Sequence, residues 1–139
     1  MPTIAPDRCE TRSISIAAPP QDVLAVVGDA RRLPEWAPNF ARAVRPDGDA
    51  WIVDTGAGDL RVDLRVVPEL GTVDILRGDP PRGAFSRVLP NGRDGSEYLF
   101  TLFFPEGTDP AAVDAQMATV DTELEAVRAL SEARSAGAR

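Results

Sequence analysis

The hydrophobic pattern of this chain changes its period once, at Asp109–Pro110. Before this point, short segments alternate apolar and polar residues, most cleanly over Leu60–Val67, and a period of two predicts half-buried strands. After it, apolar residues recur at spacings of four and three, which predicts one stripe on a long helix. Such a helix must bury its stripe on the apolar face of the sheet. The stripe consists of Val113, Met117, Val120, Leu124 and Val127.

Turn-forming residues (Gly, Pro, Asn and Asp) divide the first part of the chain into segments of strand length. Short turns between sequential strands favour an antiparallel meander over a parallel sheet. The expected strands are Thr11–Ala17, Phe40–Arg45, Trp51–Thr55, Leu60–Val67, Val73–Arg77, Ala84–Leu89 and Ser96–Phe104.

Three helices complete the expected fold. A short apolar helix is expected over Gln21–Val27, and a second one follows Asp29, its N-cap, until Pro34 interrupts it. The long helix begins at Pro110 and runs to about Ala133. We therefore predict an α+β fold in which a seven-stranded antiparallel sheet wraps around a long C-terminal helix. Two short helices lie between strands one and two, and residues 1–139 form one domain with its core at about 11–132.

The composition excludes several classes of function. The formal net charge of −7 disfavours nucleic acid and anionic membrane surfaces as partners, because both attract cationic proteins. Histidine is absent, so a Ser-His-Asp centre and a His-ligated metal cannot form. The single cysteine, Cys9, precedes the first expected strand and cannot form an internal disulfide. We expect no metal and no cofactor, and the absence of a signal peptide or apolar span favours the cytoplasm.

Two segments carry motifs in an order shared with a known superfamily. In Ile14–Phe40 (ISIAAPPQDVLAVVGDARRLPEWAPNF), a strand is followed by Ala-Pro, a short helix, Asp and a Leu-Pro-x-Trp segment. In Arg87–Gly107 (RVLPNGRDGSEYLFTLFFPEG), an Asn-Gly turn precedes the last strand. This order resembles the START/Bet v 1-like (SRPBCC) superfamily, closest to the bacterial polyketide cyclase/dehydrase and lipid-transport proteins. Over Thr11 to Glu132, the resemblance implies a helix-grip fold with an internal hydrophobic cavity, but no particular activity.

The pocket is expected between the last strand, the long helix and the two short helices. The resemblance points Tyr98 and Phe100 inward and places Trp36 at the pocket mouth, although Trp36 could equally clamp the short helices onto the sheet. Phe40 packs in the same region, and Met117 is a flexible side chain in the middle of the helix stripe. The expected pocket residues are Trp36, Phe40, Arg77, Tyr98, Phe100, Met117 and Val120.

Some charged side chains have two readings. Strict alternation points Arg77 inward, where a guanidinium can bind a carboxylate or enolate oxygen, but the strand could already have ended, with Arg77 in water or paired with Asp79. Arg87 and Glu97 flank the Asn-Gly turn, and we expect them to form a cross-strand ion pair. Glu123 lies beside the helix stripe and can turn either way.

Three functions are consistent with this pattern. The leading one is a binding module that takes a hydrophobic or amphipathic small molecule into the cavity. The second is a polyketide aromatase/cyclase-like enzyme without metal or His, which would need polar groups such as Arg77 and Tyr98 to converge in the pocket. The third is a protein-interaction module of the chaperone-activator kind, which would need an exposed apolar or basic patch. A homodimer stays open.

Overall fold

Seven strands and a long C-terminal helix make up the computed structural model, which describes residues 6–138. In chain order, the elements are β1 (Arg8–Ile16), α1 (Pro20–Val27), the 3₁₀-helix η1 (Ala30–Arg32), α2 (Leu33–Trp36), β2 (Ala43–Asp47), β3 (Ala50–Asp54), β4 (Asp59–Val67), β5 (Thr72–Arg77), β6 (Arg82–Asn91), β7 (Gly95–Phe104) and α3 (Pro110–Gly137).

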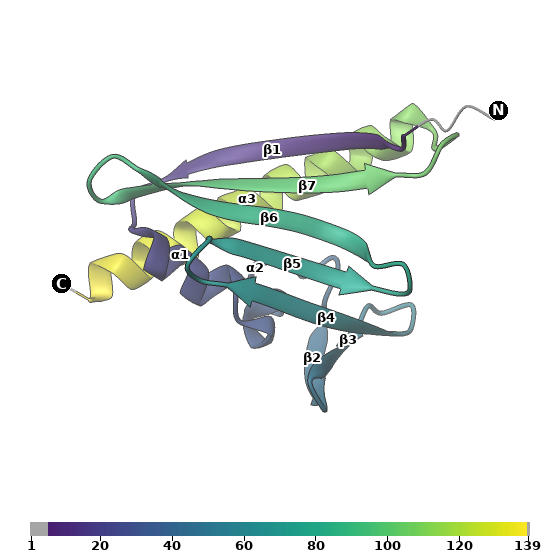
Figure 1. The fold of residues 1–139 in the computed structure, drawn as a ribbon, viewed down its shortest axis with the longest axis horizontal. Coiled ribbons are helices and arrows are strands. Elements are labelled where there is room, and N and C mark those ends of the chain that lie inside the picture. Colours follow the sequence, from purple (N-terminus) through teal and green to yellow (C-terminus); the bar gives the residue numbers. More distant parts are fainter. Residues whose placement is uncertain (1–5, 139) are drawn as a thin grey trace.

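The strands form one antiparallel sheet in the order β1-β7-β6-β5-β4-β3-β2. Strands β2 to β7 form a meander, and β1 extends the sheet by pairing with β7 at its edge. Helix α3 crosses one face of this sheet, and α1 and α2 lie on the same side (Figure 1). The predicted helix-grip architecture is therefore confirmed.

Helix α3 begins where the period changes. The carboxylate of Asp109 accepts a hydrogen bond from the backbone N–H of Ala111 at 3.0 Å, and Pro110 takes the first helical position. Both are favourable choices for the start of a helix. The helix extends to Gly137, beyond the predicted end at Ala133. Its stripe is buried as predicted, and α3 packs mainly on α1, α2 and β1.

The region around Pro34 differs from the prediction. Asp29 does act as an N-cap, since its carboxylate accepts a hydrogen bond from the Arg31 N–H at 3.0 Å. The turn it caps is η1, and the chain then continues into α2, with Pro34 in the first turn of that helix. Pro34 therefore does not interrupt a helix. A first-turn residue needs no N–H donor, so a proline is tolerated there.

Two strand boundaries also differ from prediction. Strand β1 begins at Arg8, so Cys9 lies within it, exposed and directly opposite Phe103 of β7, and not ahead of the first strand. Strand β2 begins at Ala43, which leaves Phe40 in the preceding loop. An exposed edge strand such as β1 shows too little apolar alternation at its start to be located from sequence.

The predicted ion pair between Arg87 and Glu97 does not form. That pairing would require β6 and β7 to reverse about Gly92, but Asn91 pairs with Gly95, so the reversal is centred on Arg93, one residue later. Arg87 consequently lies opposite Leu99, and its guanidinium donates to the Leu70 carbonyl at 3.1 Å. Glu97 instead accepts hydrogen bonds from the Ser15 hydroxyl at 2.6 Å and the Asn91 amide at 3.1 Å.

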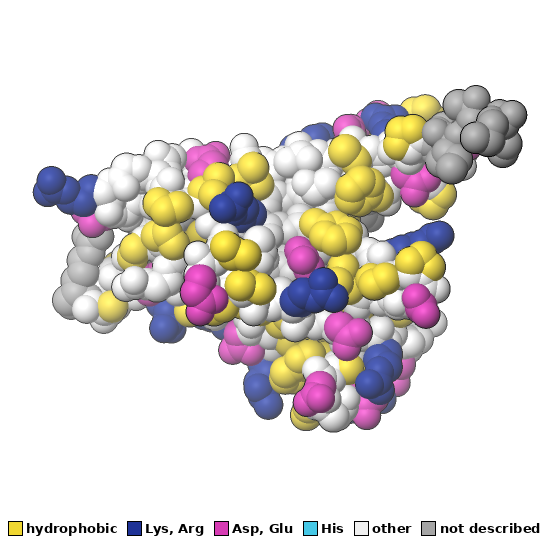
Figure 2. Space-filling model, viewed as in Figure 1, with side chains coloured by type: hydrophobic (Ala, Val, Ile, Leu, Met, Phe, Trp, Pro, Cys, Tyr) yellow, Lys and Arg dark blue, Asp and Glu magenta, His cyan; other side chains and the backbone are white. Residues whose placement is uncertain are grey.

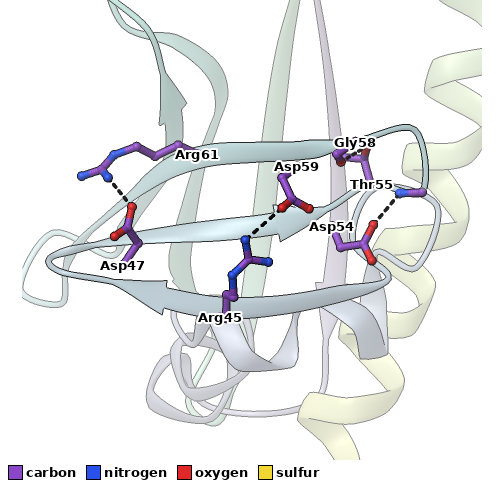
Figure 3. A network of polar contacts seen from close by, with 8 residues as sticks. Arg45, Asp47, Asp54, Thr55, Gly58, Asp59 and Arg61 are labelled. Carbon is purple, nitrogen blue, oxygen red and sulfur yellow. Dashed lines mark hydrogen bonds and ion pairs between the residues drawn. The ribbon is translucent and has the colours of Figure 1, made fainter.

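The β2–β3 hairpin is tied to β4 by two surface ion pairs (Figure 3). The guanidinium of Arg45 lies 2.9 Å from the Asp59 carboxylate, and Arg61 pairs with Asp47. The hydrogen bond to Asp59 raises the pKa of Arg45. Because these pairs are exposed, they add little stability, but they orient Arg61 toward the hairpin.

The outer face of the sheet, away from α3, is mixed in character. Figure 2 shows hydrophobic side chains scattered among charged ones over this face. On it, the rings of Phe85 and Phe103 meet edge to face, with their centroids 5.8 Å apart. Both rings remain exposed, at 36% and 51%.

Candidate functional site

The main candidate site is a hollow at the end of the sheet where β6 and β7 separate. The last residue pair of their ladder is Ala84 with Leu102, although β6 begins at Arg82 and β7 continues to Phe104. Figure 1 shows β6 curving away from β7 at this end. We name the space the β4–β7 hollow, and its volume is about 390 Å³. It is lined by Phe40, Leu60, Val62, Ile75, Leu76, Arg77, Gly83, Ala84, Leu102 and Phe103.

The register of four strands builds the floor of the hollow. Leu64, Ile75, Ala84 and Leu102 form one row across β4, β5, β6 and β7 on the inner face. The small side chain of Ala84 in the middle of this row leaves space above it. Helix α3 does not fill that space, because it packs mainly on β1 and on the other helices. The result is an apolar cavity of the size that small-molecule sites occupy.

Arg77 provides the only side-chain hydrogen-bonding group among the ten lining residues. It is the last residue of β5 and is exposed. Among the described residues, it forms no ion pair with Asp79 or with any other carboxylate. The sequence left open whether Arg77 points inward or reaches water. In the structure its side chain lines the hollow and is also exposed to solvent.

Only two of the seven predicted pocket residues, Phe40 and Arg77, line this hollow. The other five belong to the hydrophobic core, where Phe100 is 7% exposed and the rest are less so. Contact between a ligand and these five side chains stays a prediction. They are Trp36, Tyr98, Phe100, Met117 and Val120.

Sequence reasoning missed most of the actual lining. The alternation does place Leu60 and Val62 on one apolar face, so the signal for their orientation was present. It carries no information on which part of that face α3 covers. Nor does it show that β6 and β7 part at Gly83. The hollow therefore lies next to the predicted pocket, one inward residue further along β7 than Phe100.

A second group of polar side chains lies in the core. Glu123 is only 9% exposed, and burial raises the pKa of its carboxyl to about 7. The sequence left open which way Glu123 points, and in the structure its side chain turns inward. Burial also raises the pKa of Tyr98, and the nearby charge of Glu123 adds to this effect, while a hydrogen bond with Ser86 opposes it. The Ser86 hydroxyl itself donates to the Val73 carbonyl at 2.6 Å.

Two further buried groups have no hydrogen-bond partner among residues 6–138. They are the indole N–H of Trp36 and the hydroxyl of Ser131. An unpaired buried polar group costs free energy, on the order of 1–3 kcal/mol. Neither residue lines the β4–β7 hollow.

The described part of the chain shows no group of three Cys, Asp or Glu side chains placed to hold a metal ion. None of its helices is long and apolar enough to cross a membrane. The only polar side chain in the hollow is a guanidinium, which can hold or stabilise an anion but does not act as a base at neutral pH. The lining of the hollow therefore offers one group that can hold an anion and no base.

Comparison with known proteins places the chain in a family. Residues 9–132 match the family model described as polyketide cyclase / dehydrase and lipid transport. A comparison with curated proteins found no match.

Several solved structures share the fold. The Zhui aromatase/cyclase from Streptomyces sp. R1128 is 13% identical, with a TM-score of 0.69 over 91% of this chain and 94% of that one. The di-domain aromatase/cyclase BexL from the BE-7585A biosynthetic pathway is 17% identical, with a TM-score of 0.69 over 90% of this chain and 46% of that one. The Aha1 dimer from Colwellia psychrerythraea is 14% identical, with a TM-score of 0.65 over 89% of this chain and 96% of that one.

At these identities the structural neighbours show the fold alone, whereas the family model spans most of the sequence, including β1 through most of α3. The chain therefore belongs to the polyketide cyclase / dehydrase and lipid transport family.

Proposed function

We propose that the protein binds a hydrophobic or amphipathic small molecule in the β4–β7 hollow. The observation that carries this proposal is an apolar cavity of about 390 Å³ with one polar side chain at its edge. Ligand sites in proteins are typically apolar spaces of this size with a few polar groups that fix orientation. Membership of a family described by polyketide cyclase, dehydrase and lipid-transport activity supports the same class of ligand.

The chemistry of the hollow favours binding over an aromatase/cyclase-like reaction. Such a reaction calls for several polar groups that converge on the ligand, and Tyr98 would be the natural partner of Arg77. Tyr98 is 1% exposed in the core and is not part of the hollow lining. A single guanidinium in an apolar cavity orients a ligand without supplying a proton donor and acceptor pair.

Binding can be tested with the neutral fluorescent probe N-phenyl-1-naphthylamine. We expect its fluorescence to rise on addition of the protein and the melting temperature to rise with it. A hundredfold excess over Kd adds about 2.7 kcal/mol to the free energy of unfolding.

The location is tested by filling the hollow. Ala84→Phe places a ring in the middle of the inner row and should abolish probe binding. Ser13→Phe adds the same ring to the exposed outer side of β1 and should leave binding unchanged. If Ala84→Phe bound the probe as tightly as wild type, the probe would bind outside the β4–β7 hollow.

A further inference from the structure

Two arginines stand side by side at the mouth of the β4–β7 hollow. Arg77 ends β5, Arg82 begins β6, and they are direct cross-strand partners. Arg77 lines the hollow, and Arg82 directly precedes Gly83, which also lines it. An adjoining, more polar hollow of about 540 Å³ is lined by both arginines and shares Leu60 and Arg77 with the first. The apolar cavity thus opens beside a pair of positive charges.

The pair places two like charges opposite each other in a chain with 22 acidic and 15 basic residues. Seven other arginines form ion pairs, but no described carboxylate lies within 4.0 Å of the guanidinium of Arg77 or Arg82. Like charges directly opposite each other on neighbouring strands destabilise a sheet. The fold therefore carries a repulsion at this position that no contact within the described chain relieves.

The other charged groups nearby do not neutralise the pair. Arg61 lines the adjoining hollow, but Asp47 already holds its guanidinium (Figure 3). Asp79, in the turn between β5 and β6, is the only acidic residue in that lining, and it forms no ion pair with either arginine. Asp7 shares a further hollow with Arg82 and forms no ion pair with it either. The linings of the β4–β7 hollow and the adjoining hollow together contain three arginines and one aspartate, on a protein of net charge −7.

We infer that the ligand of the β4–β7 hollow is an amphiphilic carboxylate, with its apolar part among Ile75, Ala84 and Leu102 and its carboxylate held jointly by Arg77 and Arg82. This inference rests on the proposed function and gives its ligand a chemical class. The planar guanidinium group matches the two oxygens of a carboxylate, and charge-assisted hydrogen bonds of this kind are stronger than neutral ones. An anion between the two arginines also replaces their repulsion by two attractions.

The test compares decanoate with decan-1-ol, which have the same chain length and differ in the charge of the head group. Isothermal titration calorimetry gives Kd for both ligands with wild type and with the variants Arg77→Gln and Arg82→Gln. Decanoate should bind wild type at least about ten times more tightly than decan-1-ol. Each variant should weaken decanoate binding about tenfold, equivalent to about 1.4 kcal/mol, and should weaken decan-1-ol binding much less, so that the preference for decanoate narrows.

Arg93→Gln is the matched control, since Arg93 is an exposed arginine without an ion pair in the β6–β7 turn, at the other end of these strands. It should bind both ligands as wild type does. In the absence of ligand, Arg82→Gln should raise the melting temperature because it removes the repulsion. Arg77→Gln and Arg82→Gln each change an exposed side chain, so both proteins should remain folded.

The outcomes separate this inference from the proposed function. If decan-1-ol binds in the hollow and decanoate binds no more tightly, the carboxylate assignment is wrong and the apolar site stands. If decanoate is preferred but neither arginine variant weakens it, the assignment to Arg77 and Arg82 is wrong. If wild type binds neither ligand, both the inference and the proposed function fail.

Discussion

Replacing Glu123 with glutamine is expected to make the protein more stable at neutral and alkaline pH and to leave it nearly unchanged in mild acid. Glu123 is buried on the inner side of α3, and burial raises its pKa from an ordinary value of 4.5 to about 7. No described cation forms an ion pair with it. Its ionised form therefore has no partner that offsets the loss of hydration.

The sign of the effect follows from proton binding. Between the two pKa values the folded protein holds a proton on Glu123 that the unfolded chain has lost, so raising the pH weakens folding in this range. Below 4.5 both states are protonated, and above about 7 both are ionised. The free energy of unfolding that is lost across this window amounts to about 3 kcal/mol.

Urea unfolding of wild type and Glu123→Gln over this range measures the effect. The variant's advantage should grow by about 2–3 kcal/mol between about pH 5 and about pH 8. Asp121→Asn is the control, because Asp121 lies on the same helix but is exposed and paired with Arg12 at 3.3 Å. Such a surface pair changes stability by less than about 1 kcal/mol. A difference between wild type and Glu123→Gln that stays constant with pH would contradict the assignment of a buried, unpaired carboxyl.

The architecture could be predicted from sequence because it depends on local patterns. The alternation of Leu60–Val67 and the change of period at Asp109–Pro110 each fix the type of an element, whatever lies around it. These two features need only the period of the element and one apolar core. The family resemblance, and not the period, pointed Tyr98 and Phe100 of β7 inward, and both are buried.

The features that failed depend on contacts between distant segments. The pairing of Arg87 with Glu97 was wrong because the reversal between β6 and β7 is centred on Arg93, one residue beyond the Gly92 that this pairing requires. The position of the hollow depends on where α3 crosses the sheet and where β6 leaves β7. Neither position is encoded in a local period. The apolar face of the sheet could therefore be predicted, but the part of that face that α3 leaves uncovered could not.

Gly83 shows how one backbone position supports the hollow, and its replacement by alanine is expected to cost the most stability of any single methyl addition in that lining. Its φ is +147°, a conformation that L residues rarely adopt. A Cβ built there would lie 1.9 Å from the carbonyl oxygen of Ile75 on the neighbouring strand. Because backbone atoms cannot turn aside as side chains do, β5 and β6 would have to separate.

Gly58 allows the two costs of such a substitution to be measured separately. It has the same φ of +147°, but its Cβ would have no neighbour within 4 Å. Gly58→Ala should therefore cost only the conformational strain, about 1–3 kcal/mol. Gly83→Ala adds to the same strain the cost of separating two paired strands. Its free energy of unfolding should therefore fall by more than about 4 kcal/mol, which is exceptional for a point substitution.

Urea unfolding of the two variants gives the comparison directly, and ligand binding gives a second readout. Because Gly83 lies between Arg82 and the floor residue Ala84, any separation of β5 from β6 also moves Arg82 away from Arg77. The folded fraction of Gly83→Ala should thus lose decanoate affinity, while Gly58→Ala should bind as wild type does. Equal free energies of unfolding for the two variants would show that β5 and β6 are not in close contact at Gly83, and the geometry of the hollow mouth would then be wrong.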